Sequence, residues 1–292
     1  MAAPSAPSGG SSLLSNLTKV IVSKQAQKLQ YSVGMRMLTC TFLDDGLRVI
    51  FDYSNQSDYM AGQLRWFSML SPLVLLLMCS AQLGGSAFLW LNKRTNTAAY
   101  ILAGVVGVQV LLYTSLFDFH FFARNVGVIG GLLVLAGADD PTKQRRSLTM
   151  MDTIKGKDDK QKYLLLAGRV LTGFLPLTIV LKERAYMNSV IFAMLAIATC
   201  GLGALVATGF NPHSGADEAA DHETTQAAAV GLAVLMLLET MYAHIGWITL
   251  DHGHWEKDLH RYYFFQLLSV VGGILLVASR GPGSINLSAK KL

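Results

Sequence analysis

A short apolar stretch of the sequence carries a group of charged side chains that could bind a polar ligand or pair with one another. Residues 33–51 contain Arg36, Asp44, Asp45 and Arg48. Asp44 and Asp45 precede Arg48 by four and three residues, a spacing that puts them on one face of a helix. Ionisable side chains at membrane depth usually have a charged partner and often a function. We therefore expect Asp44 or Asp45 to pair with Arg48 or with Arg124. This pairing serves either a binding site or a purely structural lock.

Two further polar positions lie in apolar runs and extend the expected intramembrane polar network. Arg124 is followed by Asn125, and Glu239 is preceded by apolar residues and followed by Thr240, Tyr242 and His244. A buried Glu at this depth could line a polar cleft or relay protons, and it could equally be structural.

The sequence contains no motif that predicts catalysis, a cofactor or a metal site. Histidines gather in Asp251-His252-Gly253-His254, but zinc sites need three or four ligands at defined spacing, so a polar loop is the better interpretation. The cysteines stand alone in apolar runs and are interpreted as packing residues: Cys40, Cys79 and Cys200. We expect a protein that is not an enzyme.

The composition indicates how these side chains are positioned. The chain has 292 residues, of which 52% are hydrophobic and only 15% are charged, whereas soluble domains carry about 25% charged residues. This balance predicts an all-α polytopic membrane protein and excludes a disordered chain, a coiled coil and a nucleic-acid binder.

About 20 mainly apolar residues are needed to cross a bilayer as a helix. Seven stretches meet or approach this length: 67–91, 98–117, 121–137, 163–181, 189–208, 228–250 and 263–279. Residues 33–51 form an eighth candidate, whose charges prevent it from inserting alone. About eight transmembrane helices are therefore expected.

Basic residues predict the orientation of these helices. With eight spans, fifteen Lys and Arg residues flank one face and five flank the other. The positive-inside rule then puts both termini in the cytosol. The cytosolic parts are an N-terminal flank (1–32), a basic linker (138–162) and a tail (280–292).

An internal repeat divides the membrane part into two units. Phe122–Ala136 aligns with Phe264–Ala278 at a constant offset of 142, and Arg36–Thr39 resembles Arg169–Thr172. Either two four-helix units, 33–137 and 163–279, arose by parallel duplication, or glycine-rich helices look alike by chance. Glycines predict close helix packing at Gly84-Gly85, Gly130-Gly131 and Gly272-Gly273, with Gly104 and Gly107.

Four blocks of the sequence resemble the surfeit locus protein four family: 41–48, 56–59, 118–135, and 263–273 with 281–283. Members of that family are multi-pass receptors with a DoxX-like membrane fold that cycle between the endoplasmic reticulum and the Golgi. The resemblance implies that soluble secretory cargo is bound through apolar N-terminal motifs in a lumenal cleft and coupled to coat protein II. Asp44, Asp45, Asp58 and Tyr59 lie at or near the expected lumenal face, and we hypothesise that they line that cleft.

The tail departs from the family pattern. The dilysine signal read by coat protein I needs Lys at the third position from the end and at the fourth or fifth. Here Lys290 and Lys291 follow Ala289, so the expected retrieval signal is weak.

Three functions stay open at this point: a cargo receptor, a structural subunit of a larger organellar membrane complex, and a transporter that uses Asp45, Arg124 and Glu239. No cleavable secretory signal is visible, and the acid-free, basic stretch before Asp44 also suits a mitochondrial or plastid transit peptide. The lipid bilayer is the expected environment, and a homo-oligomer is compatible with the sequence.

Overall fold

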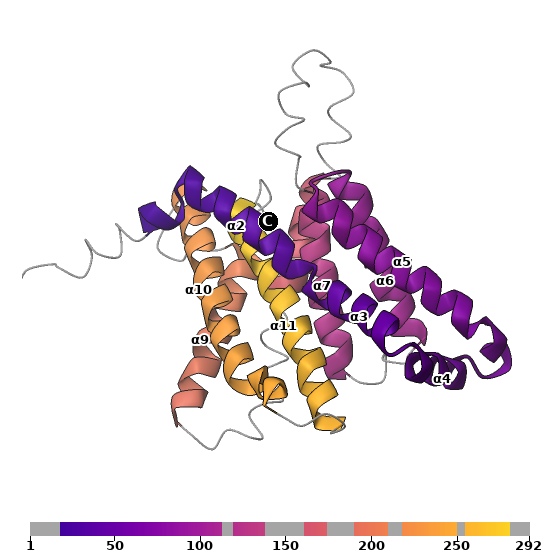
Figure 1. The fold of residues 1–292 in the computed structure, drawn as a ribbon. Helices are drawn as coiled ribbons and strands as arrows, with labels where there is room; N and C mark the ends of the chain where they lie inside the picture. The colour runs from indigo at the N-terminus through magenta and orange to yellow at the C-terminus, as the bar shows by residue number, and fades with distance from the viewer. Residues whose placement is uncertain are drawn as a thin grey trace, which may run out of the picture.

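The computed structural model describes residues 18–112, 119–137, 161–173, 190–209, 218–249 and 255–280. Within these ranges the chain is helical and has no strand, which confirms the all-α prediction (Figure 1). The helices are α2 (Lys24–Leu38), α3 (Cys40–Phe51), α4 (Tyr53–Leu64), η1 (Arg65–Leu70), α5 (Ser71–Trp90), α6 (Thr95–Leu112), α7 (Phe119–Gly137), α9 (Val190–Thr208), α10 (Glu218–His244), η5 (Ile245–Ile248) and α11 (Trp255–Arg280). Residues 161–173 form a further helix.

Four helical stretches are long and apolar enough to cross a membrane: Phe67–Trp90, Thr95–Leu112, Glu223–Ile248 and Glu256–Arg280. Two apolar helices are shorter, Phe121–Gly137 and Ala193–Thr208. These six coincide with six of the expected spans, and the helix at 161–173 begins a seventh whose remainder lies outside the described residues. The total of eight spans and the division into two four-helix units remain predictions.

The structure departs from the prediction of a single helix over residues 33–51. The helix is interrupted at Thr39, which separates α2 from α3. The fully buried Thr39 hydroxyl donates to the Arg36 carbonyl at 2.7 Å and accepts from the Trp90 indole N–H at 2.8 Å. Because a threonine hydroxyl that bonds back to its own helix competes with the backbone ladder, it bends or breaks the helix there.

A serine of α11 repairs the hydrogen bond that the break removes. In an unbroken helix the Thr41 N–H would donate to the Met37 carbonyl, four residues earlier. Instead, the Ser269 hydroxyl accepts from the Thr41 N–H at 3.0 Å and donates to the Met37 carbonyl at 3.2 Å. The two backbone groups are thus satisfied by α11, which fixes the point at which α2 and α3 cross it (Figure 1).

α7 and α11 pack side by side and run parallel. The rings of Phe121 and Tyr262 stack with centroids 5.6 Å apart. One turn further, the Gln266 amide donates to Asn125 Oδ1 at 3.3 Å. Facing residues therefore differ by 141 positions here, close to the sequence offset of 142. A duplication that placed the equivalent helices against each other would give this register.

Glycines let this helix pair and its neighbours approach backbone to backbone. A Cβ at Gly131 would lie 2.8 Å from Gly273 Cα, and one at Gly272 would lie 2.6 Å from the Gly34 carbonyl oxygen of α2. A Cβ at Gly130 would likewise lie 3.0 Å from the Gly168 carbonyl oxygen, in the helix at 161–173. We call the set of Gly34, Gly130, Gly131, Gly168, Gly272 and Gly273 the glycine seam. These contacts are the close packing that the sequence predicted.

The other predicted glycines differ from one another. A Cβ at Gly85 would lie 2.8 Å from the Leu102 side chain of α6, whereas one at Gly84, Gly104 or Gly107 would meet no atom of another described element within 4 Å. These three positions lie on the open faces of α5 and α6, where a side chain has room.

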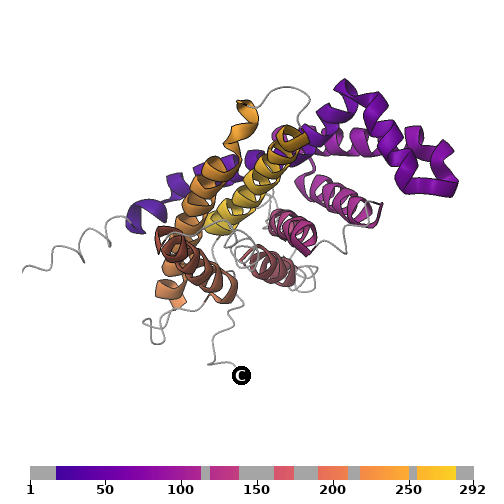
Figure 2. The ribbon, with the colours of Figure 1, turned by 90° about the horizontal axis from the view of Figure 1, so that it is seen from below.

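The remaining helices flank the α7–α11 pair on its two sides. α10 packs on α11 and α9 on α10, whereas α6 packs on α7, α5 on α6, and α3 on both α5 and α11 (Figure 2). The second group surrounds a space between α3, α5, α6, α7 and α11, and that space holds the polar side chains of the first half.

Candidate functional site

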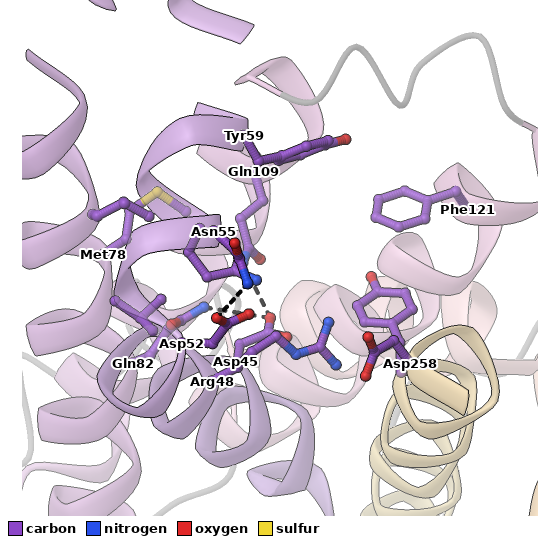
Figure 3. A pocket seen from close by; sticks show the side chains of 14 residues that line it. Asp45, Arg48, Asp52, Asn55, Tyr59, Met78, Gln82, Gln109, Phe121 and Asp258 are labelled. Carbon is purple, nitrogen blue, oxygen red and sulfur yellow. Dashed lines mark hydrogen bonds between the residues drawn. The ribbon is translucent and has the colours of Figure 1, made fainter. Parts of the chain in front are cut away.

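A cavity of about 650 Å³ opens between these helices, near the first residues of α7 and α11 (Figure 3). Its volume lies within the roughly 300–1,000 Å³ of small-ligand sites. Polar, charged, aromatic and aliphatic side chains line it: Asp45, Arg48, Val49, Asp52, Asn55, Gln56, Tyr59, Leu75, Met78, Gln82, Gln109, Phe121, Asp258 and Tyr262.

Asp45 of α3 is held in the cavity by side chains of two neighbouring helices. Gln82 of α5 and Gln109 of α6 donate their side-chain amides to its Oδ2, at 3.5 Å and 3.2 Å (Figure 3). Oδ1 accepts no hydrogen bond from any described residue. Neutral amides fix the carboxylate without neutralising it, so Asp45 can still receive a cationic group.

Asp44, its neighbour in sequence, is enclosed in ion pairs. Its carboxylate is buried and lies 3.1 Å from the guanidinium of Arg48 and 2.5 Å from that of Arg261, on α11. Arg261 also donates through Nε at 2.8 Å. Asp44 therefore joins α3 to α11 and does not line the cavity. Of the pairs expected from the sequence, Asp44 with Arg48 is present.

The cavity carries more negative than positive charge. Among the described lining residues, Asp45, Asp52 and Asp258 contribute three carboxylates and Arg48 contributes one guanidinium. Arg48 already faces Asp44. A partly open site with this excess of acid attracts cations and disfavours anions.

Aromatic rings form the wall of the cavity on the α7–α11 side. Tyr262 and Phe121 stack almost in parallel, with 5° between their planes. The hydroxyl of Tyr262 accepts from the Gln266 amide at 3.2 Å, which also reaches Asn125. These bonds hold the Tyr262 ring in place, and the wall offers apolar area beside the acids.

A second, smaller cavity of about 150 Å³ adjoins the first. It is lined by Arg48, Phe51, Asp52, Gln56, Asp258 and Arg261. Four of these residues line both cavities, so Arg48 lies on the boundary between them.

The other predicted site residues lie in different places. Tyr59 lines the cavity, whereas Asp58 is exposed and does not. The Arg124 guanidinium lies over the Tyr263 ring at 3.9 Å. Glu239 accepts from Thr199 at 3.1 Å, at the packing of α10 on α9, and is not part of the cavity. Lys290 and Lys291 lie outside the described residues.

Several side chains of the candidate site were not predicted from the sequence. Gln82 and Gln109 are the amides in the apolar runs 67–91 and 98–117, and an amide in such a run is a detectable signal. Arg261 counted only as a basic flank of a span, since nothing local to it indicates a partner 217 residues earlier.

The described residues contain no group of three or more His, Cys, Asp or Glu side chains that could hold a metal ion. His252 and His254 lie outside the described residues.

Comparison with known proteins identifies relatives along almost the whole chain. The SURF4 family matches residues 12–292. The Surfeit locus protein 4 homolog of Drosophila melanogaster is 28% identical over 92% of this chain and 93% of its own length. The ER-derived vesicles protein ERV29 of Saccharomyces cerevisiae is 28% identical over 89% and 76%, and the Surfeit locus protein 4 homolog of Schizosaccharomyces pombe is 26% identical over 89% and 80%. No solved structure matches the chain. The match over residues 12–292 shows that the chain belongs to the SURF4 family.

Proposed function

We propose that this protein is a transmembrane receptor that binds soluble secretory proteins in the lumen of the endoplasmic reticulum and carries them into vesicles bound for the Golgi. Membership of the SURF4 family supports this function. The name of the yeast relative, an ER-derived vesicles protein, supports the compartment.

The cavity around Asp45 is the proposed cargo site. Its acidic and aromatic lining is the observation that best supports the proposal. The free amino terminus of a processed secretory protein is a cation attached to a short, flexible segment. Asp45 supplies an anion with one oxygen available, and Tyr59, Phe121 and Tyr262 supply aromatic area for apolar side chains. Capture of a terminal amine in a polar recess is a recurring mode of peptide recognition.

The proposed orientation is supported by the position of the cavity along α7. Phe121 lies near the start of this helix, and the basic linker 138–162 follows its end. If the linker is cytosolic, as its Lys and Arg content favours, the cavity is near the lumenal face. Both termini are then cytosolic, where coat protein II, and coat protein I through Lys290 and Lys291, are the proposed partners.

The test is export of a reporter cargo from cells that lack the endogenous receptor. We expect wild-type protein to restore secretion and Asp45→Asn to reduce it several-fold, because the neutral side chain no longer attracts the amino terminus. Asp58→Asn is the matched control, since Asp58 is exposed and outside the cavity lining. Unchanged secretion with correctly localised Asp45→Asn would contradict the proposed site.

A further inference from the structure

The position of Arg48 suggests a second contact to the same ligand. We propose that Arg48 donates to the first peptide carbonyl of a ligand whose terminal ammonium rests on Asp45. The cavity then recognises an amino terminus as a unit, and an isolated amine, such as a lysine side chain, binds less well. This inference rests on the proposed function.

Asp45 and Arg48 point into one cavity from one helix. They are three residues apart on α3, so their side chains are neighbours on the same face. Both line the large cavity, and Figure 3 shows them close together at its base. A ligand group bound to Asp45 therefore has Arg48 as its adjacent polar contact.

Arg48 has donors left for a ligand. Its guanidinium carries five N–H groups, and among the described residues one hydrogen bond is made, to Asp44 at 3.1 Å. The Arg48 side chain is 22% exposed and lies between the two cavities. Its Cζ atom lies 5.9 Å from the centroid of the Tyr262 ring. The remaining N–H groups are available for an acceptor in the cavity.

Asp44 fixes Arg48 in this position before any ligand arrives. Arg261 holds the Asp44 carboxylate from α11, so Asp44 in turn anchors one edge of the Arg48 guanidinium. A planar guanidinium that is already oriented loses little freedom when it binds a carbonyl oxygen. The buried ion pair is therefore a positioning device for the ligand contact.

The amino terminus of a peptide matches this arrangement. Its ammonium and its first carbonyl are separated by one Cα, which gives a cation and an acceptor at short range. A lysine side chain has the ammonium but no acceptor near it. The small cavity beyond Arg48, with Asp52, Gln56 and Asp258, gives the following backbone a polar path.

A double-mutant cycle between protein and peptide tests this contact. The full-length protein, in lipid nanodiscs, is titrated with a labelled peptide that begins with apolar residues, and with an analogue whose first amide is a trans-alkene. The analogue keeps the ammonium and the shape but lacks both the carbonyl and the N–H of that amide, and the comparison with the Arg48 variant isolates the carbonyl. We expect the alkene to weaken binding to wild-type protein about tenfold or more, because a hydrogen bond to a charged donor is lost. Arg48→Met, which has no N–H to donate, should bind both peptides equally.

Two further variants separate the contact from a loss of structure. Arg36→Gln removes an exposed arginine of α2 that lines neither cavity, so the alkene effect should persist. Arg48→Leu keeps aliphatic bulk but has no N–H donor, and it replaces Arg48→Met if that variant does not fold. A full alkene effect in the folded Arg48 variant would overturn the role of Arg48.

The same titrations distinguish failure of this inference from failure of the proposed function. If Asp45→Asn weakens peptide binding and the alkene effect survives in the Arg48 variant, only the carbonyl contact is wrong. If wild-type protein does not prefer the free amino terminus over an acetylated one, the proposed site itself is wrong.

Discussion

α7 and α11 build two unlike regions along one interface. Toward their C-terminal ends they meet at Gly131 and Gly273, where no side chain separates the backbones. Toward their N-terminal ends they meet through Phe121, Tyr262 and the Asn125–Gln266 hydrogen bond, and a cavity opens beside them. One region is held by shape and the other by polar pairing.

The difference shows how a membrane helix bundle can carry an open polar site. Lipid tails are as apolar as the helix surfaces, so no hydrophobic effect holds the helices together and close backbone packing does much of this work. The glycine seam supplies that packing away from the cavity. At the N-terminal ends of α7 and α11, the acids and amides of the cavity can therefore be arranged for a ligand. Close packing is not required of them there.

The glycine seam should tolerate substitution least. Gly272→Leu forces a side chain into the Gly34 carbonyl and the Met37 backbone of α2, at 2.6 Å and 2.9 Å from the new Cβ. Because backbone cannot move aside cheaply, we expect a loss of about 3–5 kcal/mol and little monodisperse protein in detergent. Size-exclusion profiles of fluorescently tagged protein measure this. Gly107→Leu, on an open face of α6, should behave as wild type; equal damage from both would refute the seam.

The ion pairs at the cavity end should be the next most sensitive feature. Asp44→Asn leaves the guanidiniums of Arg48 and Arg261 without their anion. Breaking a buried pair costs about 3–5 kcal/mol, but both arginines are partly exposed, so we expect about 1–3 kcal/mol. Thermal unfolding in detergent compares this variant with Asp45→Asn, which should lower Tm less and affect peptide binding more. The reverse order would mean that the two acids have exchanged roles.

The repaired helix break gives a smaller and more local effect. Ser269→Ala removes the hydroxyl shared by the Thr41 N–H and the Met37 carbonyl, at a cost of about 1–2 kcal/mol. Hydrogen exchange at the Thr41 amide should become faster. Ser279→Ala is the control because that hydroxyl bonds only within its own helix, to the Leu276 carbonyl. An unchanged Thr41 exchange rate would show that the hydroxyl is dispensable.

The smallest effect is expected at the contact between α5 and the break. Trp90→Phe keeps the aromatic body and removes the 2.8 Å hydrogen bond to the Thr39 hydroxyl. We expect a loss of about 0.5–1.5 kcal/mol and unchanged cargo export. Phe88→Leu, at an exposed position of the same helix, controls for the loss of aromatic area. A drop in export as large as that of Asp45→Asn would connect the break to the cavity.

Much of the fold was predictable because the helices and their close contacts depend on local sequence patterns. The apolar runs predicted six helices that the structure describes in full or in large part. The glycine pairs at 130–131 and 272–273 predicted the close approach of α7 and α11 to their neighbours. Gly84, Gly104 and Gly107 look the same in sequence but have no close neighbour among the other described elements. A glycine permits close approach, and only the partner helix decides whether it occurs.

The site was only partly predictable, because its parts come from distant segments. Asp44 and Arg48 are one helical turn apart, and their pairing follows from that spacing. Arg261 and Gln109 reach α3 only through tertiary packing. Asp44 and Asp45 are adjacent in sequence, yet their side chains have different surroundings, since consecutive residues of a helix point about 100° apart.

The hydrogen bonds that join the Ser269 hydroxyl to α2 and α3 can form only after the last helix has been synthesised. The ribosome releases α2 and α3 long before α11, so the Ser269 hydroxyl is absent while the first helices form. In lipid, the Thr41 N–H and the Met37 carbonyl must then bond to each other, as in an unbroken helix. A nascent chain truncated before Ser269 therefore lacks the bridge at the break between α2 and α3 as well as the last helix. The structure of the N-terminal helices therefore depends on whether translation has reached the C-terminal helix.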